Sequence, residues 1–518
     1  MPSSLIFPIF QDCAGKRQRK CTKPPTLFDY NGTVRYNVKS VVREKSSAEA
    51  ASAGQKVGVN MEENRANRSG ISEEMKQLCA EFRRNNQIPP EKFTLYGVKR
   101  GLRNPDGTGV LAGLSLISNV HGYLINDSVR VPDKGVLTYR GIDVSEIIDG
   151  CLAAGRFGYE EVVWLLLLGE LPTKKQLESL HRVLSFYREL PENFAEDMIL
   201  KAPSANIMNK LARSVLALYS YDDNPDDTSL ENSIRQSFQL IAQLPAIMTY
   251  AYQVKRRRFD KESMFFHPVN PEESIAESIL DAIRPDRQYT DEEAKLLDLC
   301  MILHAEHSGG NNSTFTVRSV SSTGSDIYSA IAAGIGSLKG PLHGGANHKV
   351  MRMMEDLMAN VKHWQSETEV RDYLIKLVKK EAGDRSGLIY GMGHGVYTLS
   401  DPRAVILKRE AAKLAPSHGM EEKLALFELV ERLAPEAFAE VRGDTKVISA
   451  NVDFYSGLVY EMLRIPSDLY TPMFAVSRMA GWCAHRIEEM ETAKRIMRPA
   501  YRSLSQPRPY IPLEERES

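Results

Sequence analysis

The sequence is poor in the residues and runs that mark several protein classes. Its 518 residues include six cysteines, which are scattered and form no Cys-x-x-Cys pair. This spacing favours reduced thiols over a disulfide framework, and so a cytoplasmic location. The longest apolar runs, such as 162–168, are far shorter than the roughly 20 residues that cross a bilayer. A net charge of −1 excludes a globally basic nucleic-acid binder, although 66 Lys and Arg can still form a local basic pocket.

The first 60 residues have no hydrophobic periodicity. They carry ten Lys and Arg against four Asp and Glu, with a basic cluster at 16–20. No apolar core follows a basic start, so no secretory signal peptide is predicted, and frequent Pro, Gly and Ser argue against the amphipathic helix of a mitochondrial presequence. We predict a disordered extension over residues 1–60, with Met61 as a candidate true start.

Helical periodicity dominates the rest of the chain. Helix signals predict segments over about 72–84, 159–168, 173–190, 208–220, 230–257, 272–283, 291–304, 326–338, 347–364, 401–414 and 471–492. Thr173 and Gln176 form a capping box, while Asp401-Pro402 and Thr471-Pro472 each resemble an N-cap followed by a first-turn proline.

A short β element is expected before the main helices. Residues 121–131 and 136–140 are rich in strand-forming residues, and Pro132–Gly135 between them has the chemistry of a tight reversal. The sequence therefore predicts an all-α protein with a minor β hairpin near 120–140.

His343 lies in the run Gly-Pro-Leu-His-Gly-Gly-Ala-Asn, just before an expected helix start. The glycines after it let a substrate or another backbone approach closely. The positive end of the helix dipole disfavours the imidazolium and favours a neutral ring that donates one hydrogen bond, as a developing enolate oxygen requires. The alternative is a histidine that makes structural hydrogen bonds in a glycine-rich turn.

His394 lies in a Gly-x-Gly-x-Gly run, and Arg403 follows in the first turn of an expected helix. The run predicts a backbone strip against a flat or phosphate-bearing ligand, with the histidine offered to a carbonyl. A plain loop is the default explanation, because the spacing does not fit the dinucleotide fingerprint. Since an arginine opposes the dipole at a helix start, we interpret Arg403 as a carboxylate clamp.

Asp453 and Arg478 are charged residues in apolar surroundings. Asp453 lies between the apolar residues of 447–452 and a helix over 458–463, which makes it a candidate base with a shifted pKa. The alternative is an N-terminal helix cap. Arg478 lies inside an apolar helix, so it needs a protein or ligand partner unless its head group reaches the surface.

A metal site is the competing interpretation of the histidines. His304 and His307 are three residues apart, and His343 and His394 could join them, as histidines do in zinc sites. The sequence has no His-Glu-x-x-His motif, and we expect no metal.

Five segments between roughly residues 93 and 502 together resemble the citrate synthase family, and its bacterial-type members most. They are 139–143, 304–312, 340–347, 391–403 and 451–457, and their order and spacing make the match specific. The resemblance implies an all-α homodimer whose large domain, 61–340 with 452–518, is joined by a small domain, 341–451, that closes over a cleft. It also implies an acyltransferase of the tricarboxylic acid cycle that condenses acetyl-CoA, oxaloacetate and water to citrate and CoA.

The resemblance also implies a role for each candidate residue. Asp453 would abstract a methyl proton from acetyl-CoA, His343 would hold the thioester oxygen, and His394 would polarise the oxaloacetate ketone. The residues that would bind oxaloacetate are His307, Arg403, Arg478, Arg140 and, from the neighbouring subunit, Arg498. The residues that would contact CoA are Gly391, Met392 and Gly393. CoA thioester is a substrate here, so no cofactor is implied, and neither a membrane nor nucleic acid is an expected partner.

Gly395 departs from the family pattern, in which a larger residue often follows the histidine. This leaves the acyl preference open, because 2-methylcitrate synthases share every segment quoted and a hydrophobic pocket discriminates one methylene by only about 1–3 kcal/mol. 2-Methylcitrate synthase is therefore the main alternative. A citryl-CoA lyase module is disfavoured because no ATP-grasp or CoA-ligase portion is recognisable. A non-catalytic CoA-binding scaffold is disfavoured by the joint presence of Asp453, His343 and His394.

Overall fold

The structure is a computed structural model that describes residues 73–127, 129–443 and 447–516. The predicted extension over 1–60 and the candidate start at Met61 lie outside these residues. Contacts between residues divide the chain into two units, Met1–Tyr96 and Gly97–Ser518. The described part of the first unit contains a helix over 73–85 and the short helix α2, Pro90–Leu95.

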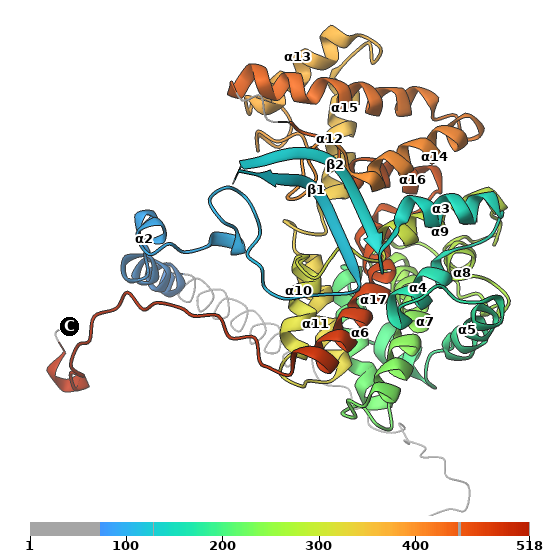
Figure 1. Cartoon of the computed structure of the whole chain (residues 1–518), viewed down its shortest axis with the longest axis horizontal. Coiled ribbons are helices and arrows are strands. Elements are labelled where there is room, and N and C mark those ends of the chain that lie inside the picture. The colour runs from blue at the N-terminus through green and yellow to red at the C-terminus, as the bar shows by residue number, and fades with distance from the viewer. Residues whose placement is uncertain (1–72, 128, 444–446, 517–518) are drawn as a thin grey trace, which may run out of the picture. The chain divides into compact units, whose positions relative to one another are not determined.

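The second unit is built almost entirely of helices, as the periodicity predicts (Figure 1). Its α-helices are α3 Val144–Ala153, α4 Tyr159–Leu168, α5 Lys174–Tyr187, α6 Ile207–Leu218, α7 Leu230–Lys255, α8 Ile275–Ile283, α9 Asp291–His304, α10 Asn312–Ser321, α11 Ile327–Lys339, α12 Ala346–Asn360, α13 Glu367–Val378, α14 Pro402–His418, α15 Glu421–Arg442, α16 Val452–Met462 and α17 Tyr470–Glu488. The all-α class is confirmed.

Helix starts follow the capping signals in two of the three predicted cases. Thr173 and Gln176 form the capping box of α5, and the Asp401 side chain caps α14. The third prediction is wrong. Helix α17 begins at Tyr470 without a side-chain cap, and the Thr471 hydroxyl instead donates to the Gly344 carbonyl at 2.8 Å. A local N-cap signal is overridden here because a tertiary partner takes the hydroxyl.

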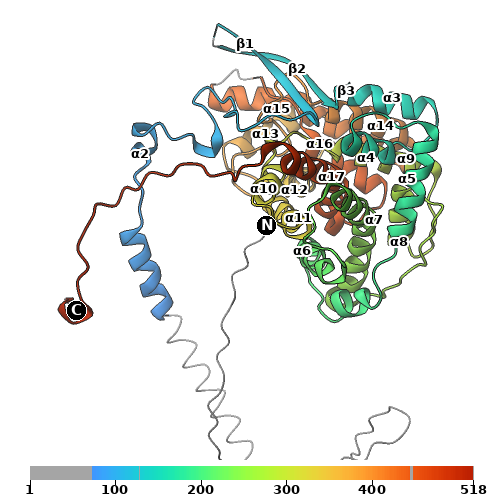
Figure 2. The same ribbon diagram turned by 60° about the horizontal axis from the view of Figure 1, so that its bottom comes forward.

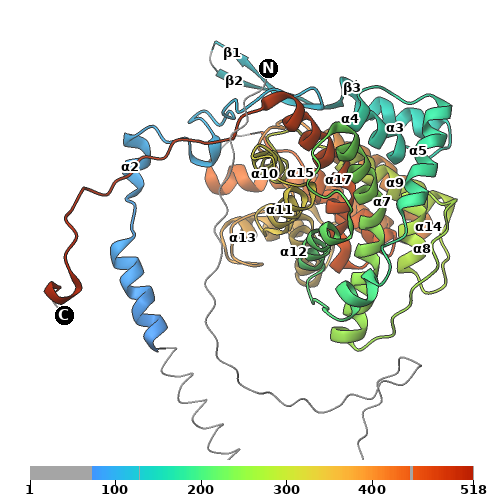
Figure 3. The ribbon, with the colours of Figure 1, turned by 90° about the horizontal axis from the view of Figure 1, so that it is seen from below.

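Helix α17 is the centre of the second unit. It is buried along most of its length and packs against α4, α7, α9, α10, α11 and α12. Figures 2 and 3 show it between α11 and α7. Further along, α13 packs on α15, while α12 and α14 both pack on α16. The division into a large and a small domain stays a prediction.

The predicted hairpin is present, but its reversal lies elsewhere. Strand β1, Ser118–Asn126, pairs antiparallel with β2, Val129–Tyr139, and β3, Ile142–Asp143, completes a three-stranded sheet. The chain therefore turns after Asn126, and the prediction of a turn at Pro132–Gly135 is wrong. Those residues lie within β2. They face the point on β1, between His121 and Tyr123, where the pairing register shifts. Turn-forming residues make a bulge here, which tolerates proline and glycine inside a strand.

Candidate active site

Asp401 joins the beginnings of two helices that are distant in sequence. Its buried carboxylate accepts from the Arg403 backbone N–H, from Arg403 Nε at 3.0 Å and from Arg403 Nη2 at 2.7 Å. It also accepts from the Val452 backbone N–H, at the first residue of α16, at 3.1 Å. One carboxylate thus holds the arginine at the start of α14 beside the residue that precedes Asp453.

The segment that carries His394 is tied to the same helix start. Gly393 N donates to Ser449 O at 2.7 Å, and Asn451 Nδ2 donates to Gly393 O at 2.8 Å. Gly391 has a φ of 78°, and a Cβ there would lie 2.8 Å from Phe454 and from Val350. This glycine therefore permits both the left-handed backbone and the close approach to α16.

The His394 ring has a defined tautomer. Its Nδ1 accepts from the backbone N–H groups of Val396 at 3.0 Å and Tyr397 at 3.1 Å. An atom that accepts twice carries no proton, so Nε2 carries it and is a donor. Burial, with the charge of Arg403, lowers the pKa of His394 to about 4, so the ring is neutral at pH 7. The Tyr397 ring stacks on it with centroids 4.7 Å apart.

His343 is the second neutral histidine. It lies in the turn before α12, and its Nε2 is 3.2 Å from Ser313 Oγ. Burial, with the charge of Arg478, lowers the pKa of His343 to about 4. The predicted neutral state agrees with the burial of the ring and with the nearby charge of Arg478.

Asp453 is a carboxylate with no side-chain hydrogen bond among the described contacts. It lies in the first turn of α16, and Asn451, not Asp453, is the N-cap of that helix. Burial raises the pKa of Asp453 to about 6, although Arg403 and Arg478 act in the opposite direction. A carboxyl group whose charged form is disfavoured by burial, so that its pKa approaches neutral pH, is suited to act as a base.

Arg478 is fully buried in α17 and has spare donors. Its Nε donates to the His304 carbonyl at 2.7 Å, but its Nη1 and Nη2 have no partner among the described residues. Burial lowers its pKa to about 10, so the charge persists at pH 7. A buried guanidinium with two unpaired nitrogens is costly unless an anionic ligand completes it.

His307 lies beside His394 and completes the polar wall. The two rings meet edge to face with centroids 5.1 Å apart, and His307 Nε2 is buried without a partner in the described part of the chain. Burial lowers the pKa of His307 well below its ordinary value, with Arg403 and Arg478 adding to the effect. Its unpaired nitrogen therefore belongs to a neutral ring that can contact a ligand.

The two arginines connect these groups electrostatically. Arg403 acts on His394, His307 and Asp453, and Arg478 acts on His343, His307 and Asp453. Arg403 and Arg478 therefore form one pair of buried cations that several segments share. The side chains around them come from the turn before α12, from residues 391–403, and from the starts of α14 and α16.

Two predicted substrate residues are not brought to this group within a single chain. Arg140 Nε and Nη2 both donate to the Leu166 carbonyl near the end of α4, at 3.1 and 2.6 Å. Arg498 is exposed, ten residues after the end of α17. The Gly391–Gly393 strip is next to His394, as its position in the chain requires.

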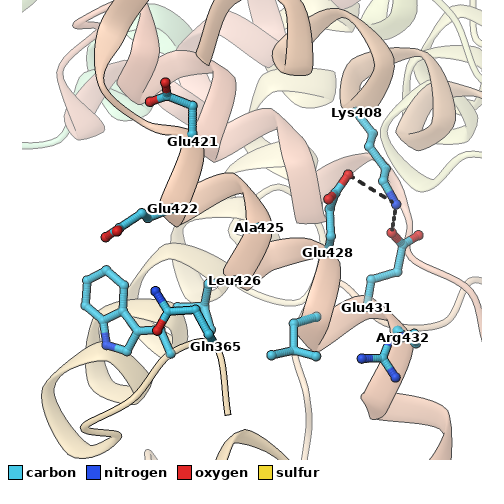
Figure 4. A pocket seen from close by; sticks show the side chains of 11 residues that line it. Gln365, Lys408, Glu421, Glu422, Ala425, Leu426, Glu428, Glu431 and Arg432 are labelled. Carbon is cyan, nitrogen blue, oxygen red and sulfur yellow. Dashed lines mark hydrogen bonds and ion pairs between the residues drawn. The ribbon is translucent and has the colours of Figure 1, made fainter. Parts of the chain in front are cut away.

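A surface pocket over α14 and α15 holds none of the predicted site residues (Figure 4). Three of its charged side chains pair with one another: Lys408 Nζ lies 2.9 Å from Glu431 and 3.7 Å from Glu428. None of its lining side chains is a buried donor without a partner among the described residues, unlike Arg478.

Sequence reasoning missed three residues that shape the site. Tyr397 stacks on His394 and has a buried hydroxyl without a described partner. Ser313 contacts His343, and Asp401 bridges to α16 in addition to capping α14. The available signal was position: Tyr397 is three residues from His394, and Ser313 is six residues after His307.

The described ranges contain neither a metal-ligand cluster nor a membrane-spanning helix. No group of three or more His, Cys, Asp or Glu there is arranged to hold a metal ion. No helix among the same residues has the length and hydropathy needed to cross a membrane.

This helical fold, with a carboxylate beside neutral histidines and two buried arginines, is found together with matches that define an enzyme of the acyltransferase class. A family model for the citrate synthase C-terminal domain matches residues 106–500. A citrate synthase from Acidithiobacillus ferridurans is 35% identical over 427 residues, covering 80% of this chain and 98% of that protein. A 2-methylcitrate synthase from Shewanella oneidensis is 32% identical, covering 78% of this chain and 98% of that protein.

Solved structures agree with these matches. A citrate synthase from Thermoplasma acidophilum, in a ternary complex with carboxymethyl coenzyme A and oxaloacetate, has a TM-score of 0.66 and 26% identity, covering 81% of this chain and 99% of that chain. A citrate synthase from Pyrobaculum aerophilum has a TM-score of 0.64 and 30% identity, covering 79% and 94% of the two chains. The chain belongs to the citrate synthase family, and the predicted resemblance is confirmed.

Proposed function

We propose that the chain condenses acetyl-CoA with oxaloacetate and water to give citrate and CoA. One observation carries this proposal: Asp453, with its pKa raised to about 6, faces the charges of two buried arginines beside neutral histidines. Carbanion formation next to a thioester needs a base and an oxyanion donor together, and each is commonly worth on the order of 10²–10⁴ in rate.

The reaction would begin with proton transfer. The Asp453 carboxylate takes a proton from the acetyl methyl group, and His343 donates a hydrogen bond to the thioester oxygen as the enol or enolate forms. For this, His343 must carry its proton on Nδ1, so its Nε2 accepts from the Ser313 hydroxyl at 3.2 Å.

Carbon–carbon bond formation would follow at the oxaloacetate ketone. The fixed Nε2–H of His394 polarises that ketone and donates to the alkoxide that develops when the enol carbon attacks. The product is citryl-CoA. Water then cleaves its thioester, which releases citrate and CoA and accounts for all the atoms.

Oxaloacetate is a dianion, and the unpaired donors of the site match it. Arg478 offers Nη1 and Nη2, and His307 offers Nε2, all of them buried without a described partner. Arg403 is held by Asp401 through Nε and Nη2, which leaves Nη1 for a ligand carboxylate. Guanidinium groups bind carboxylates in a defined planar geometry, so the ketone would be presented in one orientation.

The assignment extends to the assembly. We infer a homodimer in which exposed Arg498 reaches the neighbouring site, with the Gly391–Gly393 strip against CoA. The bound ligands of the Thermoplasma acidophilum relative support these substrates. A place in the tricarboxylic acid cycle and a cytoplasmic location complete the proposal.

The test is an acyl-specificity assay on the purified chain. Free CoA release from acetyl-CoA plus oxaloacetate should be observed, with a higher kcat/KM for acetyl-CoA than for propionyl-CoA. The relatives include both citrate and 2-methylcitrate synthases, so this comparison decides between them. Absence of CoA release with either thioester would refute the proposed function.

A further inference from the structure

The β1–β2 hairpin makes the closest backbone contacts to the segment that carries His394. The bulge of this hairpin places Gly122 on β1 opposite the residues around Gly135 on β2. A Cβ at Gly122 would lie 2.7 Å from the Cα of Tyr397, and one at Gly135 would lie 2.0 Å from the carbonyl oxygen of Ser400. Real Cβ atoms do not approach backbone so closely, so only glycine allows residues 396–400 to rest in this bulge.

Thr398 fastens the segment in the bulge. Its hydroxyl donates to the Gly122 carbonyl and accepts from the Asp133 backbone N–H at 3.1 Å. Gly135 N donates to Ser400 Oγ at 3.3 Å, two residues further along. The hydroxyl of Thr398 thus bridges both strands of the hairpin at the point where their ladder is interrupted.

Two arginines hold the other end of the same segment. Arg130 of β2 donates to the Val396 carbonyl at 3.0 Å, and Arg103 donates to the Gly395 carbonyl at 3.1 Å. A side chain at position 395 would meet Arg103, because a Cβ there would lie 3.0 Å from its Nη2. Gly395, which departs from the family pattern, therefore gives room for the guanidinium of Arg103, a residue that precedes β1 in the chain.

This arrangement leads directly to His394. The hairpin contacts the backbone of Val396 and Tyr397, and the N–H groups of these two residues are the donors to His394 Nδ1. Peptide planes are rigid, so these N–H groups are oriented together with the carbonyls of Gly395 and Val396, which Arg103 and Arg130 hold. Thr398 anchors the next residue of the same segment in the bulge. We propose that the β1–β2 hairpin is a positioning element, in which Gly122 and Thr398 fix the tautomer and direction of the catalytic His394 ring.

The inference rests on the proposed function for its kinetic consequence, but not for its structural one. The variant Thr398→Val keeps the shape of the side chain and removes the hydroxyl that bridges the strands. We expect kcat to fall by about tenfold or more, since small misplacement of a reacting group is costly. The Kd for oxaloacetate should change little, because His307, Arg403 and Arg478 are untouched. Thr398→Ser should restore turnover.

Matched controls separate positioning from folding. Thr249→Val removes a buried threonine hydroxyl in α7 that also donates to a backbone carbonyl, and it should leave kcat unchanged. Gly122→Ala should reduce kcat, whereas Gly109→Ala, with nothing within 4 Å of its added Cβ, should not. Melting temperatures of all variants identify any that simply unfold.

Nitrogen chemical shifts of the His394 ring, assigned with His394→Gln, report the tautomer without turnover. In wild type the Nδ1 shift should be that of an unprotonated nitrogen, and Thr398→Val should move it. If the wild-type protein shows this unprotonated Nδ1 shift but has no activity, the proposed function is refuted and the positioning role is not. Wild-type kcat and unchanged shifts in folded Thr398→Val, or equal losses in Thr398→Val and Thr398→Ser, would overturn the positioning role.

Discussion

Asp453, His343 and His394 owe their protonation states chiefly to burial. Desolvation is the largest cause of the shift for each, raising the pKa of the acid and lowering those of the imidazoles. The same physical effect therefore prepares a base that can take a proton and two neutral rings that can donate one. The arginines moderate the acid and reinforce the histidines.

The pH dependence follows from these shifts. Only the carboxylate form of Asp453 is a base, so kcat/KM should fall about tenfold per unit below a pKa of about 6 and level off above it. The histidines, with pKa values of about 4, stay neutral through this range and should add no step. The measurement is kcat/KM between pH 4.5 and 8. A profile that stays nearly level down to pH 5, as an ordinary aspartate pKa near 4 would give, would contradict the assignment.

Ser313 is the partner that decides the tautomer of His343. Its Oγ accepts from Trp482 Nε1 at 3.3 Å and lies 2.8 Å from Asn311 Oδ1, so its single proton can serve either Asn311 or His343. The variant Ser313→Ala removes this hydroxyl. It should lower kcat about tenfold, which corresponds to an activation free energy higher by about 1.4 kcal/mol, with little change in the Kd for oxaloacetate.

A matched control for that variant is Ser337→Ala. Ser337 Oγ also bonds an asparagine, Asn312 Oδ1 at 2.6 Å, but its exposed contact does not include a candidate catalytic group. Steady-state kinetics on both variants provide the comparison. Equal kcat values for the two variants would show that Ser313 does not act through His343.

At the scale of elements, helix starts bring the site together. Asp401 caps α14, pairs with Arg403 and reaches the first residue of α16, 51 positions further along the chain. Breaking a buried pair by removing one charge costs about 3–5 kcal/mol, whereas an exposed pair is worth about 0–1 kcal/mol.

Asp401→Asn should therefore destabilise the protein by several times the effect of Glu367→Gln, which breaks the exposed pair with Arg432. It should also weaken oxaloacetate binding, because Arg403 loses its orienting partner. Denaturant unfolding gives the two free-energy changes, and calorimetry gives the Kd. Similar destabilisation by both variants would contradict a bridging role for Asp401.

Local sequence signals predicted most of the helices and two of their caps. They did not predict contacts between segments that are distant in the chain. The capping box at Thr173 and the cap at Asp401 are local, and the structure has both. The turn at Pro132–Gly135 and the cap at Thr471 were wrong, because residues 396–400 and Gly344 supply partners that neighbouring sequence does not reveal. The contact of Asp401 with Val452 has the same origin.

At the scale of the whole molecule, Arg498 is the residue whose role in the proposed homodimer requires a second chain. Its side chain is exposed on the segment after α17, next to Met497, whose backbone N–H donates to Ser322 Oγ at 3.1 Å. If it completes the neighbouring site, Arg498→Gln and Asp453→Asn damage different chains of a shared site. Mixed dimers would then contain one undamaged site.

Subunit mixing tests this arrangement. The two inactive variants should regain activity when unfolded and refolded together, approaching about a quarter of the wild-type value for random pairing. Each variant refolded alone is the control, and sedimentation checks the oligomeric state. Activity in the mixture no greater than in the separate variants would refute the shared site.

The central claim is that the Asp453 carboxylate is the base in a site otherwise complete for oxaloacetate. Its most direct test is the kcat of Asp453→Asn, measured beside the Kd of the same variant for oxaloacetate. We predict that kcat falls by on the order of 10²–10⁴ while the Kd stays within about threefold of wild type. Wild-type turnover in Asp453→Asn would contradict the account.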